Sequence, residues 1–313
     1  MGLIVAFGVY RVNSKLLSNK KIDINATPTP QAMPLGEFKI VLDKPEEGDV
    51  ITKDSVTVSG LTKPGSWITL SGESGDYTVQ SDTSGVFSED VELSPGVNQI
   101  KVTAFEAKGA KSATGVLVVY SSSFQEKTLP TGSPNPNASG TSDIRAKVAQ
   151  DVANTINRPK AYIGTVTDIT DSTVQIKTTG SEIKQISVSA DGTTVMNTKG
   201  TVNKQVKTTD LAIGDFIVAM GYINGNSVLA AQRILITDPV TEPKIDVKLG
   251  KVSDISKKSV TSKTDVEIYK DGGTKSAKFS DLAQTDQIIF VNTIDDNDKT
   301  SLRSIFVVPQ SQG

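Results

Sequence analysis

The chain has 313 residues, with 33 lysines and arginines against 35 aspartates and glutamates, and it contains neither histidine nor cysteine. These absences exclude Ser-His-Asp and Cys-His catalysis, disulfides and thiolate metal sites. Carboxylate chemistry, lysine chemistry and oxygen-ligand metals such as Ca²⁺ stay open. Valine outnumbers leucine, 33 residues against 16, and such a composition favours strands over helices.

The first ten residues, from Met1 to Tyr10, are apolar, and Arg11 follows them. A transmembrane helix needs about 20 such residues. We therefore interpret residues 1–21 as part of a membrane anchor whose upstream half is missing; the alternative is an N-terminal strand. Basic residues follow the apolar run, and basic flanks favour the cytoplasmic side of a membrane. The orientation of an anchor depends on the charges on both of its flanks, so it also needs the missing upstream charges. Residues 22–37 are rich in proline and threonine and predict an extended spacer.

Residues 38–120 alternate between apolar and polar side chains, with Pro-Gly and Ser-Gly pairs between the alternating runs. This spacing of short strands and turns is typical of an antiparallel sandwich. The predicted strands are residues 38–42, 55–60, 66–71, 76–81, 86–93, 97–105 and 113–120.

Four segments of this region carry a resemblance: VTVSG from Val56, KPGSWITL from Lys63, DTSGVF from Asp82 and LSPGVNQIKVTA from Leu93. They resemble bacterial immunoglobulin-like modules, which occur as repeats in cell-surface proteins and beside the catalytic domains of some polysaccharide-degrading enzymes. The resemblance implies an immunoglobulin-like β-sandwich over residues 38–120. It implies little about a ligand, because this fold hosts many functions.

A linker and one helix are predicted after the sandwich. Residues 121–141 are rich in serine, proline, glycine and asparagine, which is typical of a flexible linker. Residues 142–158 are predicted to form a short connecting α-helix capped by Ser142 and ended by Pro159. Its apolar face, spaced every fourth residue, consists of Ile144, Val148, Val152 and Ile156.

The rest of the chain contains an internal repeat. IGTVTDITDSTV from Ile163 matches LGKVSDISKKSV from Leu249, and DLAIGD from Asp210 matches DLAQTD from Asp281. These sequences resemble an uncharacterised bacterial family of small β-barrel domains, found in secreted or envelope-anchored proteins. The resemblance implies two tandem barrels, over residues 160–240 and 245–309, and transfers no activity.

Two details of the repeat predict local structure. Leu211 is expected to plug one end of the first barrel, and Gly214 to permit a tight turn before the next strand. The second copy has Thr285 at the position of Gly214, so its topology is less well defined by the sequence.

Two candidate binding sites emerge. Trp67 is the only tryptophan, and its place in the alternation points it away from Ile68 and Leu70, so an exposed ring that stacks on a sugar is one interpretation. The competing interpretation, which we favour, is a ring covered by the linker or a neighbouring loop. Asp295, Asp296 and Asp298 form an acidic loop that suggests Ca²⁺, although a polar hairpin turn explains the loop better and no cofactor is expected.

The sequence thus predicts an all-β protein: an immunoglobulin-like sandwich plus two tandem small barrels and one helix. Its expected function is that of a non-enzymatic, membrane-anchored scaffold or adhesion-type protein outside the cytoplasm of a bacterial cell. Expected partners are a surface glycan or another envelope protein. A carbohydrate-binding accessory protein is the first alternative. A single-strand nucleic-acid-binding barrel is the second, disfavoured because no segment has a basic stripe.

Overall fold

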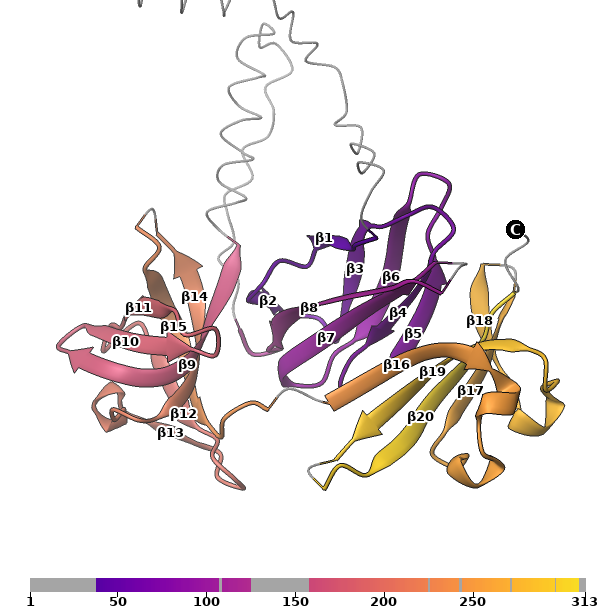
Figure 1. Cartoon of the computed structure of the whole chain (residues 1–313). Coiled ribbons are helices and arrows are strands. Elements are labelled where there is room, and N and C mark those ends of the chain that lie inside the picture. The colour runs from indigo at the N-terminus through magenta and orange to yellow at the C-terminus, as the bar shows by residue number, and fades with distance from the viewer. Residues whose placement is uncertain are drawn as a thin grey trace, which may run out of the picture. The chain divides into compact units, whose positions relative to one another are not determined.

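The computed structural model describes residues 38–309 except 107–108, 125–157, 225, 242–243, 271 and 296. This part of the chain contains twenty β-strands, four 3₁₀ turns and no α-helix (Figure 1), so its all-β character is as predicted. Within the same residues there is no helix of the length and hydrophobicity that a membrane crossing requires. The predicted anchor, the spacer, most of the linker and the helix predicted at 142–158, apart from Arg158, lie outside the described residues.

The N-terminal region, residues 38–124, contains eight strands. Each of the seven predicted strands overlaps an observed one, and the short β2 was missed. Three strands form a sheet in the order β1-β3-β6: β1 (Val41–Lys44), β3 (Ser55–Leu61) and β6 (Val86–Glu92). The other five pair in the order β2-β8-β7-β4-β5: β2 (Asp49–Ile51), β8 (Lys111–Tyr120), β7 (Gly96–Phe105), β4 (Trp67–Ser71) and β5 (Asp76–Gln80).

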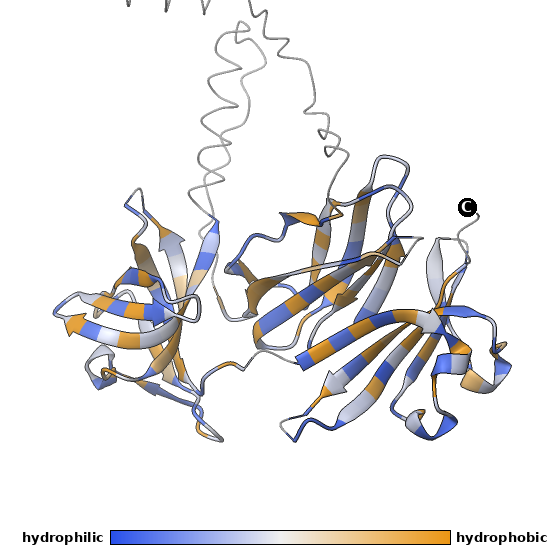
Figure 2. Cartoon of the chain, viewed as in Figure 1, coloured by the Kyte–Doolittle hydropathy of each residue, from blue (hydrophilic) through white to orange (hydrophobic). Residues whose placement is uncertain are grey.

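The core of this region lies between these two groups of strands. Polar and apolar residues alternate along strands such as β7 (Figure 2), and in every strand each second side chain points to the same face. Val58 and Phe87 from the three-stranded sheet therefore meet Leu70, Ile100 and Val118, and all five are fully or almost fully buried. Burying apolar side chains of this size contributes about 1.5–3 kcal/mol each.

The middle region, residues 158–240, continues the same sheet. Its strand β14 pairs with both β9 and β15, so β9, β10, β11, β15 and β14 form a closed circuit of hydrogen-bonded strands, with β12 and β13 attached to β15. The strands are β9 (Pro159–Thr170), β10 (Thr173–Thr178), β11 (Ile183–Ser187), β12 (Thr194–Asn197), β13 (Lys204–Val206), β14 (Phe216–Ile223) and β15 (Leu229–Thr237).

The predicted architecture, an immunoglobulin-like sandwich plus two small barrels, is wrong. Strand β2 pairs in parallel with β8 and, through Asp49 opposite Lys160, in antiparallel with β9. The backbone N–H of Ala161 also donates to the carbonyl of Gly48 at 2.7 Å. Hydrogen bonding therefore runs without a break from the N-terminal into the middle region, and one twelve-stranded sheet spans both. Sequence alternation identifies strands but carries no information about this long-range pairing.

The C-terminal region, residues 244–309, is a five-stranded sheet in the order β16-β19-β20-β17-β18. Its strands pair in the same order and directions as β9-β14-β15-β12-β13, which accounts for the internal repeat. The strands are β16 (Lys244–Lys251), β17 (Asp265–Lys270), β18 (Gly273–Ser276), β19 (Gln287–Ile294) and β20 (Thr300–Val307).

The second predicted barrel is an open sheet for a local reason. After β16, the chain forms two 3₁₀ turns, Val252–Asp254 and Lys257–Ser259, where the first copy continues β9 and adds β10 and β11. Without counterparts of those strands, nothing in the described residues connects β16 back to the far side of the sheet. The shorter second copy therefore keeps the paired strands of the first copy and loses the closure.

The repeated Asp-Leu block has the same structural role in both copies. Leu211 and Leu282 are buried in the cores of their own copies. The carboxylate of Asp215 accepts a hydrogen bond from the backbone of Ala212 at 3.0 Å, and Asp286 accepts the same bond from Ala283 at 2.9 Å. The left-handed φ of 94° that glycine provides at position 214 is the one the predicted tight turn needs.

A glycine opens each repeat, Gly164 in the first copy and Gly250 in the second, and replacing the two with alanine is expected to destabilise the protein to different extents. A Cβ atom on Gly164 would lie 2.2 Å from the backbone carbonyl oxygen of Lys177, whereas one on Gly250 would meet the side chain of Asp254 at 2.7 Å. A side chain can rotate away more easily than a paired strand can move. Gly164→Ala is expected to lower the free energy of unfolding by about 1–3 kcal/mol, and Gly250→Ala by less. Urea unfolding of both variants checks this ranking, and equal losses would contradict it.

Candidate functional site

Trp67 lies on the sheet face opposite Ile68 and Leu70, as its place in the alternation predicted, but its ring is covered. Only 3% of the residue is exposed. The ring of Tyr269 packs edge-on against it, with centroids 4.7 Å apart and an interplanar angle of 82°. The surrounding cluster, here called the Trp67 cluster, consists of Trp67, Phe105, Ile245, Val247, Ile289, Val291, Phe306 and Val308.

The cover over Trp67 is therefore a whole sheet of the C-terminal region, rather than the linker or loop that the sequence suggested. In this arrangement the ring offers no face for stacking on a sugar. Strand β4 is buried on both faces, because Ile68 and Leu70 face the N-terminal core while Trp67 faces the second copy of the repeat. A binding role for Trp67 stays a prediction.

A polar contact beside the Trp67 cluster joins β5 to β20. The guanidinium Nε of Arg303 lies 3.0 Å from Asp76 Oδ2, and its Nη2 donates to the carbonyl of Gly72 at 2.6 Å. The hydroxyl of Ser304 also donates to Asp76 Oδ2. The side chain of Asp76 is fully buried. Burial raises the pKa of Asp76 above its ordinary value, an effect opposed by the charge of Arg303 and the hydrogen bond from Ser304.

Two lysines satisfy backbone acceptors on the outer edge of β16. Lys101 Nζ donates to the carbonyl of Ile245 at 2.5 Å, and Lys111 Nζ donates to that of Val247 at 2.7 Å. An open strand edge is a template for unwanted pairing, and charged side chains are a common means of protecting it. The edge left open in the second copy is therefore capped by lysines of β7 and β8.

The acidic loop Asp295–Asp298 is a hairpin turn. Asp295 Oδ1 accepts the backbone N–H groups of Asn297 and Lys299, both at 2.9 Å. In the first copy, the uncharged Asn224 accepts two backbone N–H groups in the same pattern, so the repeat needs an oxygen here and not a charge. Asp298 adopts a left-handed φ of 57°, and Asp296 lies outside the described residues. Nowhere in the described residues do three or more acidic side chains gather closely enough to hold a metal.

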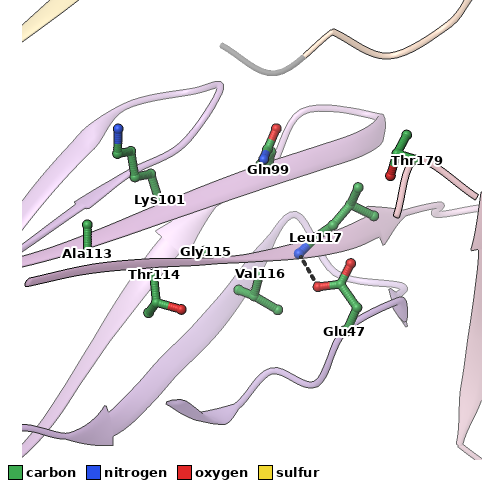
Figure 3. A pocket seen from close by; sticks show the side chains of 9 residues that line it. All are labelled: Glu47, Gln99, Lys101, Ala113, Thr114, Gly115, Val116, Leu117 and Thr179. Carbon is green, nitrogen blue, oxygen red and sulfur yellow. Dashed lines mark hydrogen bonds between the residues drawn. The ribbon is translucent and has the colours of Figure 1, made fainter. Parts of the chain in front are cut away.

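An open groove of about 440 Å³ runs along β8, on the part of the strand that β2 does not cover (Figure 3). Its floor contains the small residues Ala113 and Gly115. Glu47 lies at one end, where its Oε2 accepts the backbone N–H of Leu117 at 3.0 Å. The remaining lining residues are Gln99, Lys101, Thr114, Val116 and Thr179.

A second depression of about 560 Å³ adjoins the groove, because both are lined by Glu47, Leu117 and Thr179. It contains Tyr162, whose hydroxyl donates to the carbonyl of Ser227 at 2.9 Å and whose ring lies 5.7 Å from Lys184 Nζ. Burial raises the pKa of this tyrosine.

Two other aromatic residues of the middle region, Phe216 and Tyr222, do not line this depression with Tyr162. Phe216 and Tyr222 are each only 7% exposed and face an apolar cluster shared with the N-terminal region. Base stacking needs an accessible ring face. The middle region therefore lacks, in its described residues, the series of exposed aromatic rings on which single-strand binding would depend.

A charged cluster around Glu46 crosses the junction between β2 and β9. Glu46 Oε1 lies 2.9 Å from Lys44 Nζ and 3.0 Å from Arg158, and its Oε2 lies 2.9 Å from Lys160. Lys160 also lies 2.7 Å from Asp49. Hydrogen bonds from Lys160 and then Lys44 lower the pKa of Glu46 to about 2, from an ordinary value of 4.5.

This shift predicts an acid dependence of stability. Because folding lowers the pKa of Glu46, its contribution is complete above pH 4.5 and is lost as the pH falls towards 2. Glu46→Gln is expected to flatten the fall in the urea midpoint between pH 4.5 and 2. Added salt should reduce the difference between the pH profiles of wild type and Glu46→Gln, because Glu46 is half exposed. Glu73→Gln, in the turn before β5, controls for the loss of one carboxylate, and identical pH profiles for wild type and Glu46→Gln would contradict the assignment.

Sequence reasoning missed the groove. Gln99, Ala113 and Gly115 were visible only as outward positions of two strands, and nothing local distinguishes them from other outward residues. Glu47 and its neighbour Glu46 have different partners: Glu47 accepts a backbone N–H, and Glu46 contacts a cluster of basic side chains.

No model of a known protein family matches the chain, and no curated protein matches it. Among solved structures, it is similar to a Ca²⁺-stabilised adhesin that helps an Antarctic bacterium bind ice (17% identity, TM-score 0.20, covering 87% of this chain and 73% of that one). It is also similar to a tandem-repeat part of a large adhesion protein (11%, 0.22, 88% and 75%). A third is a Bacteroides ovatus protein from a mixed-linkage glucan utilisation locus, in complex with a heptasaccharide (11%, 0.21, 88% and 71%). At such TM-scores these similarities carry no argument about this chain.

Proposed function

We propose that this chain is a non-enzymatic scaffold or adhesion-type protein of the bacterial cell envelope, held at the membrane by its N-terminal segment. The observation that supports a scaffold is the apolar packing between successive regions. The Trp67 cluster joins the N-terminal and C-terminal regions. A second cluster, which includes Val119, Ala161 and Met220, joins the N-terminal and middle regions. Regions packed in this way form a stiff body suited to presenting a surface away from an anchor.

Protease accessibility in a bacterial host tests the location. The full chain with a C-terminal epitope tag is expected to sediment with membranes, and protease added to intact cells or spheroplasts should remove the tag while a cytoplasmic marker survives. A variant lacking residues 1–37 is the matched control and should lose membrane association. Protection of the tag until the cells are lysed would overturn the proposed location, and unchanged sedimentation of the control would overturn the anchor.

Glycan binding is a second candidate, favoured by the groove along β8. Gln99, Thr114 and Thr179 bring uncharged hydrogen-bonding side chains to it, and Tyr162 lies in the adjoining depression. Such groups suit a neutral sugar. A pull-down of the full chain with immobilised glycans is expected to weaken in Gln99→Ala and Tyr162→Ala. Retention of binding by both variants would argue against the groove.

A further inference from the structure

Strand β8 has one free edge. Its full length pairs with β7 on one side, whereas β2 covers only Val118–Tyr120 on the other. Residues 111–117 have no strand partner on that side among the described residues. At the end of this stretch, the backbone of Leu117 is bonded to Glu47 and Gly48. Lys111, Ala113 and Gly115 are exposed, so the edge is open to solvent.

The direction of each backbone group follows from the register. The N–H and carbonyl of Leu117 point away from β7, because they bond to Glu47 Oε2 and to the N–H of Gly48. The pairing of β8 with β7 shows no bulge, so backbone groups alternate regularly along the strand. Lys111, Ala113 and Gly115 therefore also point their N–H and carbonyl groups outward.

The usual protection of an edge is missing along this stretch. Natural edges are blunted by inward charges, proline or bulges, but Ala113 and Gly115 are small and uncharged. The one charged side chain, Lys111, is engaged with the carbonyl of Val247 and lies 3.6 Å from Asp246. The lysines that cap the edge of β16 thus leave the edge of β8 available.

We propose that this edge pairs in antiparallel with the same edge of a second copy, about a two-fold axis through Ala113. In this register Lys111 lies opposite Gly115 of the second copy and Ala113 opposite Ala113. All three outward residues then find partners, and Ser112 lies opposite Thr114, a pair that favours cross-strand hydrogen bonding. Isologous contacts of this kind are the commonest basis of dimers.

Other registers satisfy fewer groups. An axis at Lys111 would place two like charges opposite each other, which disfavours pairing. An axis at Thr114 would set Lys111 against Leu117, whose outward groups are already bonded to Glu47 and Gly48. The axis at Ala113 avoids both problems. Because only a short stretch pairs, the interface falls below the roughly 1,000 Å² of a stable complex, and association is expected only at micromolar or higher concentrations.

A proline substitution tests the edge without disturbing β7. Ala113→Pro removes an N–H that points outward, and proline is tolerated on the free side of an edge strand. The full chain is expected to show a concentration-dependent dimer by sedimentation velocity, and this variant should weaken it by at least about tenfold, since both bonds of the central pair are lost. Ala113→Ser keeps the N–H and is the matched control. Unchanged Trp67 fluorescence verifies the fold.

Cysteine cross-linking gives a second readout that does not depend on proline. The chain has no cysteine, so Ala113→Cys introduces one thiol per copy. Residues directly opposite in a hydrogen-bonded pair have Cα atoms about 5.5 Å apart, within the range that a disulfide spans. Oxidation should give a covalent dimer faster than it does in Ile213→Cys, whose position is 66% exposed and far from the edge in sequence.

Three results would overturn the proposal. The first is a chain that stays monomeric at all soluble concentrations. The second is a dimer that persists unchanged in Ala113→Pro, or in Ala113→Glu if the proline variant fails to fold, since the latter places two carboxylates opposite each other. The third is cross-linking at position 113 no faster than at position 213, which would indicate random collision.

Discussion

Replacing Trp67 with alanine is expected to lower the free energy of unfolding by about 3–5 kcal/mol, the usual cost of truncating a large buried aromatic side chain. The ring is 3% exposed and touches both the N-terminal sheet and Tyr269. Its removal leaves a cavity between two sheets, and neither can collapse into it without losing pairing elsewhere. Urea unfolding followed by circular dichroism measures the loss.

Tyr269→Ala is the matched variant, because it opens the same contact and keeps the only tryptophan as a fluorescent reporter. In this variant the emission of Trp67 should shift towards that of a solvated ring at urea concentrations below the main transition, because the C-terminal sheet separates first. A loss below about 1 kcal/mol for Trp67→Ala, typical of a surface position, would mean that the C-terminal sheet does not cover the ring in solution.

Replacing Arg303 with alanine is the second change of large expected effect. It leaves the fully buried carboxylate of Asp76 without its positive partner, and the removal of one member of a buried pair costs about 3–5 kcal/mol. The double variant Asp76→Asn, Arg303→Met should lose much less, because it buries no charge. A double-mutant cycle in urea measures the coupling between the two side chains, and a coupling near zero would contradict the assigned contact.

The stability of the single variant Arg303→Ala has a predicted pH dependence. Burial already raises the pKa of Asp76 above 3.8 in the folded protein, and the loss of Arg303 raises it further. An acid whose pKa is higher in the folded state binds its proton more tightly there, so stability falls as the pH rises from 3.8 through the folded pKa. Arg303→Ala should therefore be less destabilising at pH 4 than at pH 8. The opposite trend would exclude a charged Asp76 as the source of the loss.

Individual strands were predictable because apolar and polar residues alternate over a few neighbouring positions. Spacings such as Val56 and Val58, or Ile100 and Val102, predict both a strand and its buried face. The outward phase of Trp67 was correct for the same reason. The number and closure of sheets were not predictable, because they depend on one pair, Asp49 with Lys160, and on two 3₁₀ turns after Gly250 that replace strands of the first copy.

The candidate sites show the same limit. Sequence alone assigned the Asp295 loop to a turn, and the repeat supplies the reason, since Asn224 makes the same backbone contacts without a charge. The cover over Trp67 could not be predicted from the sequence, because Tyr269 comes from the far end of the chain. The same holds for Arg303, which makes its contact beside the Trp67 cluster. The groove along β8 was invisible because it is defined by where β2 stops pairing.

The lysines that cap β16 also suggest the order in which the regions fold during synthesis. Lys101 and Lys111 precede the carbonyl groups they satisfy by 144 and 136 residues, so both have left the ribosome long before β16 appears. Domains generally fold as units from the N-terminus during translation. The N-terminal sheet is then already formed when the last repeat emerges, and it serves as the template on which that open copy completes its hydrogen bonds. Transplanted alone, the second copy would carry the edge of β16 without these lysines.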